Sequence, residues 1–327
     1  MSENSAAGEV VRVGRDEGVF QRRGVEHEIR RRPWKWRGVV RFMHEARDAL
    51  AAFEAESELL LVHWPVPLLR AVAKDWSTPI LGIAHGADLA LLRHPLLAAM
   101  LGRGRVRGRL AGLLTVRRVD PVLIAKIFGA LPVAVHAMGA NSRVFRPAGV
   151  MDPEAKGRVL GVGRFERLKG FDLLLRAAAA CELPVMLLGD GPERAHLVRL
   201  ARDLQVDLLA PGFRGREAVA AALRSARVLV QPSRRGFFGR EEGFPVAVME
   251  ARATGCPVLA SRTGGLPERL HAEELFVADD LADLVRQLRP YGRIPAAARP
   301  EADPFASAEA TARALLGLVP PRPVRQH

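Results

Sequence analysis

Two glutamates, Glu242 and Glu250, are the residues whose type and spacing suggest chemistry most directly. Glu242 lies in a polar loop after the apolar run at 228–232, and Glu250 follows eight residues later. If a helix begins between them, Glu242 lies at its N-terminus and Glu250 about a turn and a half inside it. The two carboxylates then lie at different depths of one crevice, where one can reach a sugar and the other a ribose. The alternative is a pair of surface glutamates beside an ordinary helix.

The residues around the glutamates predict where that helix begins and ends. Pro245 suits the first residue of a helix, and Gly255 suits the left-handed position that closes one. The backbone N–H groups of Gly243 and Phe244 then stay free at the helix N-terminus. Such groups can donate hydrogen bonds to an anion or to sugar hydroxyls.

A second candidate site is the segment GVGRFERLKGFDLLL at 161–175. A strand is expected to end at Gly163, and the following loop carries Arg164 and Lys169 toward a new helix. Two cations at the carboxyl edge of a parallel sheet can clamp a diphosphate. They would also stabilise the negative charge that grows on the phosphate when a sugar leaves. The alternative is two solvated loop cations.

Two glycine turns complete the set, GDGP at 189–192 and TGGLPE at 263–268. Each follows an apolar run and lets the backbone approach a ligand, with Pro192 expected at a helix start. Either segment could instead be a simple tight turn.

Alternating strands and helices must position these residues. From Arg158 onward, short apolar runs alternate with amphipathic stretches, which predicts a parallel α/β sheet with ligands at the carboxyl ends of its strands. The expected strands of this half are 159–163, 185–189, 206–210, 228–232, 257–261 and 275–278. The first half alternates less clearly, with candidate strands at 25–30, 59–63, 80–85 and 133–138 and a helix from Arg37 to Phe53.

Composition describes a globular protein of two domains. The chain has 327 residues, of which 49% are hydrophobic, and no run is long and apolar enough to span a membrane. No signal pattern opens the sequence, and Cys181 and Cys256 lack metal-like spacing, so two reduced thiols and a cytoplasmic location are expected. The net charge of +13 is almost wholly arginine, clustered near 30–37 and 103–109. These clusters predict contact with an anionic membrane or with a phosphorylated acceptor, or simply a solvated surface. No aromatic pattern accompanies them, which argues against nucleic acid.

The histidines show no metal-ligand spacing, so no metal is expected. His63, His94 and His136 favour structural roles. His85 differs because it ends a predicted strand and is followed by a glycine and an aspartate. It is expected to line the cleft.

In order along the chain, the motifs are G-R-x4-K-G, G-D-G-P, P-S…E-G-F-P-x4-E-A-x-A-x-G-x-P-V and G-G-x-P-E. Together they resemble the retaining glycosyltransferases of family GT4, densely from about Arg158 to Arg269. Weaker similarities occur at LVHWPVP (61–67), AHGAD (84–88) and GANSRVFRP (139–147). The resemblance implies the GT-B fold, in which two Rossmann-like domains face each other across a cleft. We expect an N-terminal domain at 1–148, a nucleotide-sugar domain at 149–300, and a segment at 301–327 whose helix packs back toward the first domain and is followed by a disordered tail.

The resemblance also implies roles for individual residues. Arg164 and Lys169, beside Gly163, would hold the diphosphate of a UDP- or GDP-sugar, and Glu250 would bind the ribose. Glu242 would contact the transferred sugar, and the backbone of 213–215 would meet the base. The implied reaction is metal-free transfer of a hexose, with retention, to a saccharide or lipid-linked acceptor. The residues implied for the donor site are Gly163, Arg164, Lys169, Phe213, Arg214, Gly215, Glu242, Gly243, Phe244, Pro245 and Glu250; those for the acceptor side or cleft are His63, His85 and Asp88.

One departure from the family pattern leaves an alternative open. Family members open with a strand, a glycine-rich loop and a helix that face the donor phosphates, and residues 1–18 contain no such loop. We therefore expect a shortened first domain, and the alternative is a catalytically weak GT-B-like subunit that binds a nucleotide or a partner. The complete set of Arg164, Lys169, Glu242 and Glu250 favours the enzyme. A dinucleotide dehydrogenase is disfavoured because no G-x-G-x-x-G turn occurs.

Overall fold

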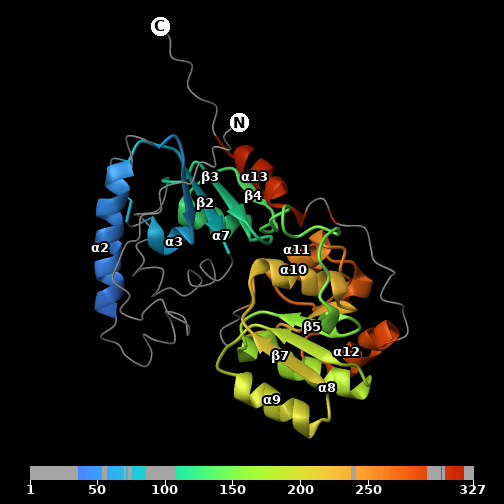
Figure 1. Cartoon of the computed structure of the whole chain (residues 1–327). Coiled ribbons are helices and arrows are strands. Elements are labelled where there is room, and N and C mark those ends of the chain that lie inside the picture. The colour runs from blue at the N-terminus through green and yellow to red at the C-terminus, as the bar shows by residue number, and fades with distance from the viewer. Residues whose placement is uncertain are drawn as a thin grey trace, which may run out of the picture.

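The chain folds into two α/β lobes, each built on a parallel sheet (Figure 1). In the first lobe the strand order is β1-β2-β3-β4, and in the second it is β10-β9-β8-β5-β6-β7. Consecutive strands of one direction require crossover connections, which here are mostly helices. The computed structural model describes residues 36–53, 57–69, 71–72, 76–85, 108–236, 241–292, 303 and 306–319.

The first lobe confirms three of the strands expected there. Its strands are β1 Leu60–His63, β2 Ile80–Ala84, β3 Gly112–Thr115 and β4 Val133–Val135, and its helices are α2 Trp36–Phe53, α3 Pro65–Leu68 and α7 Pro121–Phe128. The central strand β3 was not among the candidates, because its short GLLT run lies beside an arginine-rich segment. The candidate at 25–30 lies outside the described residues.

The two faces of the first sheet are covered by different parts of the chain. On one face, Leu113 packs with Ile127 and Phe128 of α7. On the other, Ile83 packs near Leu318, just beyond α13 Ala308–Leu316. The C-terminal helix therefore completes the core of the first lobe, and Figure 1 shows it lying along this sheet.

The second lobe contains the six strands expected of it. They are β5 Val159–Val162, β6 Val185–Leu188, β7 Leu208–Gly212, β8 Val228–Gln231, β9 Val258–Ser261 and β10 Leu275–Phe276. The prediction for β7 was wrong by two residues. This strand lies at the edge of the sheet and every residue in it is half-buried, so its apolar run marks its ends poorly.

Helices cover both faces of the second sheet. One core cluster joins alternate strand residues such as Leu160 and Leu229 to Leu223 of α10 and Val248 of α11. The second core cluster joins the strand residues that lie next to these, and that face the opposite side of the sheet, to α8 and α12. Because both faces are buried, these strands read as continuous apolar runs. The helices are α8 Phe171–Ala180, α9 Arg194–Asp203, α10 Arg216–Ser225, α11 Val246–Ala253 and α12 Leu281–Leu288; the short 3-10 turns are η3 Pro153–Ala155, η4 Arg167–Lys169, η6 Leu266–Glu268, η7 Ala272–Glu274 and η8 Arg289–Gly292.

Two stretches of chain connect the lobes, and they run side by side. Ala140 pairs with Ser307 in a parallel bridge. The N–H of Ala140 donates to the carbonyl of Ala306 at 2.6 Å, and the N–H of Ala308 donates to the carbonyl of Ala140 at 2.7 Å. Asp303 forms an ion pair with Arg252 of α11 at 2.9 Å, so the returning stretch is fixed to the second lobe. The domain limits at 148 and 300 stay predictions.

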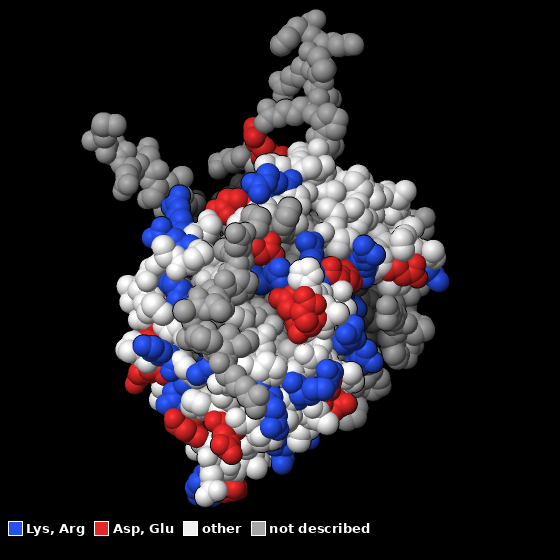
Figure 2. All heavy atoms as spheres, turned by 90° about the vertical axis from the view of Figure 1, so that its right-hand side faces the viewer, with Lys and Arg blue, Asp and Glu red and all other residues white. Residues whose placement is uncertain are grey.

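The described surface carries charges of both signs. On the face shown in Figure 2, basic and acidic side chains are interspersed. Arg109, from one of the two arginine clusters, donates to the carbonyls of Leu69 and Val72 at 3.3 and 3.1 Å, so it serves the fold. Most of both clusters lies outside the described residues, and membrane contact stays a prediction. Among the described helices, none is both long and apolar enough to cross a bilayer. Both cysteines are free thiols, Cys256 buried and Cys181 half-buried.

Candidate active site

The loop after β5 brings Arg164 and Lys169 to the carboxyl edge of the second sheet. Arg164 pairs with Glu166, with 2.9 Å between Nε and Oε1. Lys169 ends the turn η4, and its side chain folds back over Gly163, where an added Cβ would lie 3.3 Å from the lysine Cε. Both cations are therefore held at the end of β5.

Lys169 and Glu242 form an ion pair, although 73 residues separate them in the sequence. The second carboxylate oxygen of Glu242 accepts a hydrogen bond from Ser233 Oγ at 2.7 Å and a longer one from Gln231 Nε2 at 3.4 Å. Both side chains of the ion pair stay partly accessible, 18% for Lys169 and 20% for Glu242. The residue expected to hold a phosphate and the residue expected to contact the sugar thus meet at one point.

A buried polar network supports Glu242 from behind. Gln231 donates to Ser233 at 2.9 Å, and Ser261 donates to the carbonyl of Ser233 at 2.6 Å. Ser261 and Thr263 are also hydrogen-bonded at 3.1 Å. All four residues are at most 2% exposed, so they are inaccessible to a ligand and act by fixing the carboxylate. Sequence reasoning missed this role, although Ser233 lies in the P-S pair of the family motif and Thr263 opens the TGGLPE turn.

The two glycine turns support the loops that carry the candidate residues. Gly189, in GDGP, lies so close to the first loop that an added Cβ would be 1.9 Å from the carbonyl oxygen of Gly163. Gly264, in TGGLPE, has φ 56°, and its Cβ would be 1.9 Å from the carbonyl oxygen of Glu242. Both turns therefore pack against protein backbone. Pro192 precedes α9 by two residues and does not begin it.

Glu250 lies on α11, near the loop expected to meet the base. Burial raises the pKa of its carboxyl, and the nearby Arg216 opposes this shift. Among the described residues, none donates a hydrogen bond to this carboxylate. Arg216 opens α10 directly after 213–215, and Phe213 in that loop is 80% exposed. Helices α10 and α11 contact each other, which brings the predicted base-binding and ribose-binding segments near one another.

The helix start at Pro245 needs a small correction. Pro245 is the N-cap, with an extended ψ of 121°, and α11 begins at Val246. Gly255 has φ 69°, as expected for the residue that closes the helix. Because α11 begins at Val246, Glu250 lies inside the helix, which holds its carboxylate rigidly.

His85 and His63 interact at the carboxyl edge of the first sheet. His63 Nδ1 and His85 Nε2 are 2.9 Å apart, and the rings stack with 5.2 Å between their centroids. Burial lowers the pKa of His85, and the charge of His63 lowers it further. His63, for which both a structural role and a place on the acceptor side were expected, ends β1 beside His85, and its role stays a prediction. Asp88, the remaining acceptor-side candidate, lies outside the described residues.

Polar contacts and close backbone approach join the two lobes at this site. Arg117, after β3, pairs with Glu241 at 3.4 Å, and the backbone N–H of Arg118 donates to Glu268 at 2.8 Å. The backbone of Gly243 touches that of His85, since an added Cβ would lie 1.9 Å from the His85 carbonyl oxygen. Sequence reasoning missed the roles of Arg117 and Arg118, which depend on the facing lobe.

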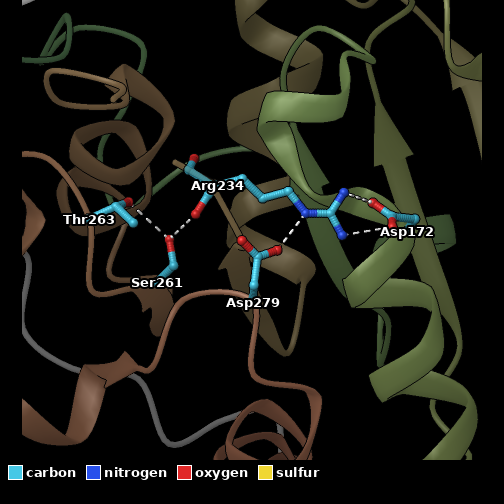
Figure 3. Close-up of polar contacts among 6 residues, drawn as sticks. Asp172, Arg234, Ser261, Thr263 and Asp279 are labelled. Atoms are coloured by element: carbon cyan, nitrogen blue, oxygen red, sulfur yellow. Dashed lines mark hydrogen bonds and ion pairs between the residues drawn. The ribbon is translucent and has the colours of Figure 1, made fainter. Parts of the chain in front are cut away.

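Arg234 ties the loop after β8 to the segment that carries Lys169 (Figure 3). Its guanidinium makes two parallel bonds of 2.8 Å to Asp172, in the first turn of α8, and one of 2.6 Å to Asp279. Its backbone N–H donates to the carbonyl of Leu168 at 2.7 Å. Because Ser233 precedes Arg234, this clamp also fixes the hydroxyl that holds Glu242.

We expect Arg234→Ala to lower the free energy of unfolding by about 1–3 kcal/mol, because two carboxylates would lose their partner in a partly buried setting. Arg234→Lys should have an intermediate effect, since lysine keeps the charge without the planar fork. Denaturant unfolding would measure both. The control is Arg202→Ala, which removes an exposed pair with Asp203 on α9. Equal stability of Arg234→Ala and the control would contradict the clamp.

Comparison with known proteins agrees with this geometry. Residues 150–290 match the family described as "Glycosyl transferases group 1". The putative colanic acid biosynthesis glycosyltransferase WcaL of Escherichia coli (strain K12) is 30% identical over 172 residues, covering 50% of this chain and 42% of that protein. Its namesake from Salmonella typhimurium is 28% identical over 289 residues, covering 80% and 70%. The chain thus spans less than half of the first relative and about two thirds of the second.

A solved structure extends the similarity to both lobes. Anabaena Alr3699/HepE, crystallised with UDP and glucose, superposes with a TM-score of 0.62 at 15% identity over 83% of this chain and 80% of that one. The two facing sheets define the GT-B fold. Residues 150–290 thus match the group 1 glycosyltransferases, and the chain as a whole is similar to proteins of family GT4.

Proposed function

We propose that this protein is a retaining, metal-independent glycosyltransferase that moves a hexose from a UDP- or GDP-sugar to a saccharide or lipid-linked acceptor. The observation that carries the proposal is the meeting of Lys169 and Glu242 at the carboxyl edge of the second sheet. Ligands bind at this edge in parallel α/β sheets. The backbone of His85, from the first sheet, touches the residue after Glu242.

The donor would lie across the carboxyl ends of the second sheet. Arg164 and Lys169 supply two cations for the diphosphate, which is the chemistry that guanidinium and ammonium groups serve at phosphates. Glu250 offers a carboxylate without a hydrogen-bond donor among the described residues, as an acceptor for the ribose hydroxyls requires. The exposed 213–215 loop, beside Arg216, would meet the base.

The reaction breaks the bond between the anomeric carbon and the β-phosphate oxygen. Charge grows on that oxygen, and Lys169 and Arg164 stabilise it more in the transition state than in the ground state. The acceptor oxygen then forms its bond on the face that the phosphate leaves, and its proton passes to a phosphate oxygen. Glu242 would hold the sugar hydroxyls during this exchange.

The relatives support the proposed substrates at a coarse level. The HepE structure contains UDP and glucose, and WcaL is assigned to colanic acid biosynthesis. Both favour a nucleotide-sugar donor and a saccharide acceptor. A GDP-linked donor, a lipid-linked acceptor and contact with an anionic membrane remain predictions from the sequence.

The test is calorimetric titration with UDP, GDP and ADP. We expect UDP or GDP to bind, and Arg164→Ala and Glu250→Ala to weaken that binding by about tenfold to a hundredfold, the effect of one lost charge-assisted contact or buried hydrogen-bond acceptor. Arg199→Ala, on the exposed face of α9, is the control. Failure of all three nucleotides to bind a folded sample would favour the alternative of a partner subunit. Unchanged affinity in both site variants would place the donor elsewhere.

A further inference from the structure

Trp64 adopts an unusual backbone conformation at the end of β1. It follows His63, the last residue of the strand, and its φ is 56°. A positive φ is a genuine outlier for a bulky side chain, and the proline that follows restricts the backbone further. Such strain persists only where surrounding structure imposes it, and it is concentrated at functional sites.

The strained backbone is fixed by the sheet. The N–H of Trp64 donates to the carbonyl of Ile83 at 3.0 Å, which continues the parallel ladder between β1 and β2. The side chain nevertheless stays 44% exposed. The sheet therefore holds a large aromatic ring at the surface, in a conformation that burial of the ring does not explain.

Trp64 extends the stacked histidine pair. Its ring lies 6.5 Å from that of His85, tilted by 35°, and His85 stacks on His63 at 5.2 Å and 16°. We refer to His63, Trp64 and His85 as the aromatic platform. It lies where β1 and β2 end, at the carboxyl edge of the first sheet.

The platform borders the proposed donor site from the opposite lobe. The carbonyl of His85 touches Gly243, whose neighbour Glu242 pairs with Lys169. The residues proposed for the nucleotide and diphosphate all belong to the second lobe. A group held on the platform would therefore approach the transferred sugar from the side that the nucleotide leaves free.

The chemistry of the platform fits a pyranose ring. The C–H bonds on one face of a pyranose carry partial positive charge, and aromatic faces carry negative charge, so the two stack. Burial and the charge of His63 lower the pKa of His85, which keeps its imidazole neutral near pH 7. Because Nε2 of His85 contacts His63, Nδ1 is the ring nitrogen that can hydrogen-bond a sugar hydroxyl. Aromatic surface with a few polar atoms is the usual composition of a small-molecule site.

We propose that the aromatic platform binds a pyranose ring of a saccharide acceptor, with Trp64 as the stacking surface. The proposal rests on the proposed function, because it assigns the acceptor side of the same cleft. On this proposal, the platform recognises the face of a sugar ring beside His85, and not a charged group or a lipid.

The test uses saturation-transfer difference NMR with the methyl α-glycosides of glucose, galactose and mannose. We expect at least one to receive saturation at its ring protons. Trp64→Ala should reduce that signal by about tenfold, because the stacking face is gone, while Trp64→Phe should keep most of it. Sorbitol, which has the hydroxyls without the ring, should give no signal. Trp76→Phe, a half-buried tryptophan before β2, is the control for loss of an indole.

Nucleotide titration of the same variants separates the two proposals. Trp64→Ala should bind UDP or GDP with unchanged affinity, because the proposed donor residues lie on the other lobe. Absence of signal from all three glycosides, or equal signals in Trp64→Ala and the wild type, would overturn the platform. Loss of nucleotide binding in the wild type would instead overturn the donor site, whatever the glycosides show.

Discussion

Lys169→Ala is expected to lower kcat/KM for sugar transfer, or for slow donor hydrolysis, by about 10²–10³, the usual loss when one charge-stabilising group is removed from a transition state. The ammonium lies over Gly163 at the end of β5, where the β-phosphate of a donor would bind. The variant should bind the free nucleotide less tightly as well, but by a smaller factor. This difference follows because charge on the leaving phosphate grows during the reaction.

The pairing of Lys169 with Glu242 makes a second explanation testable. If Lys169 only kept Glu242 in place, its removal would cost stability without changing nucleotide affinity. Glu242 would still accept hydrogen bonds from Ser233 and Gln231. Normal nucleotide affinity in Lys169→Ala would therefore contradict the phosphate role. The double variant Lys169→Ala/Glu242→Gln, compared with both single variants, would measure the coupling between the two residues. Lys156→Ala, an exposed lysine near η3, is the control.

Gly243→Ala is expected to lower the transfer rate by about a hundredfold, the cost of misplacing reacting groups by about 1 Å. The added methyl carbon would lie 1.9 Å from the His85 carbonyl oxygen and 2.8 Å from a methyl group of Val116, both in the first lobe. Atoms cannot approach so closely, so either the loop of Glu242 or the facing lobe must move.

Two comparisons would isolate this steric effect. Gly317→Ala adds a methyl group with no neighbour nearer than 3.6 Å, so its transfer rate should match that of the wild type. Gly243→Ala should lower the transfer rate by a larger factor than the affinity for the nucleotide, because Arg164, Lys169 and Glu250 share one lobe. Small-angle scattering would report wider separation of the lobes. A transfer rate equal to that of Gly317→Ala would mean that close approach of Gly243 and His85 is dispensable.

The second lobe could be predicted well because burial on both faces leaves a simple pattern. Apolar runs located β5, β6, β8 and β9 to within one residue. The pattern failed at β7, an edge strand, and at β3, which is short and has a glycine at its start. Where a strand is only half-buried or very short, apolar residues no longer mark its ends.

The candidate site could also be predicted only in part. Loop position after a strand pointed to Arg164, Lys169, Glu242 and His85, because parallel strands bring their carboxyl ends to one edge. The hydrogen-bond partners of these residues could not be predicted from the sequence. Ser261 at the end of β9 donates to Ser233, which follows the neighbouring strand β8, and Arg118 of the first lobe donates to Glu268 of the second. Those contacts depend on registers and lobe orientation that no local pattern encodes. The assigned roles of the site residues stay predictions until the nucleotide titrations are made.

The paired connections between the lobes limit how this molecule can move. A single linker would let one lobe swing and twist freely relative to the other. Here Ala140 and Ser307 are bridged side by side, and Asp303 is anchored to Arg252. Two adjacent attachment points leave one easy motion, rotation about the axis that they define, while twisting would break the bridge. Opening of the lobes along this rotation would also have to break the contacts of Arg117 with Glu241 and of Arg118 with Glu268.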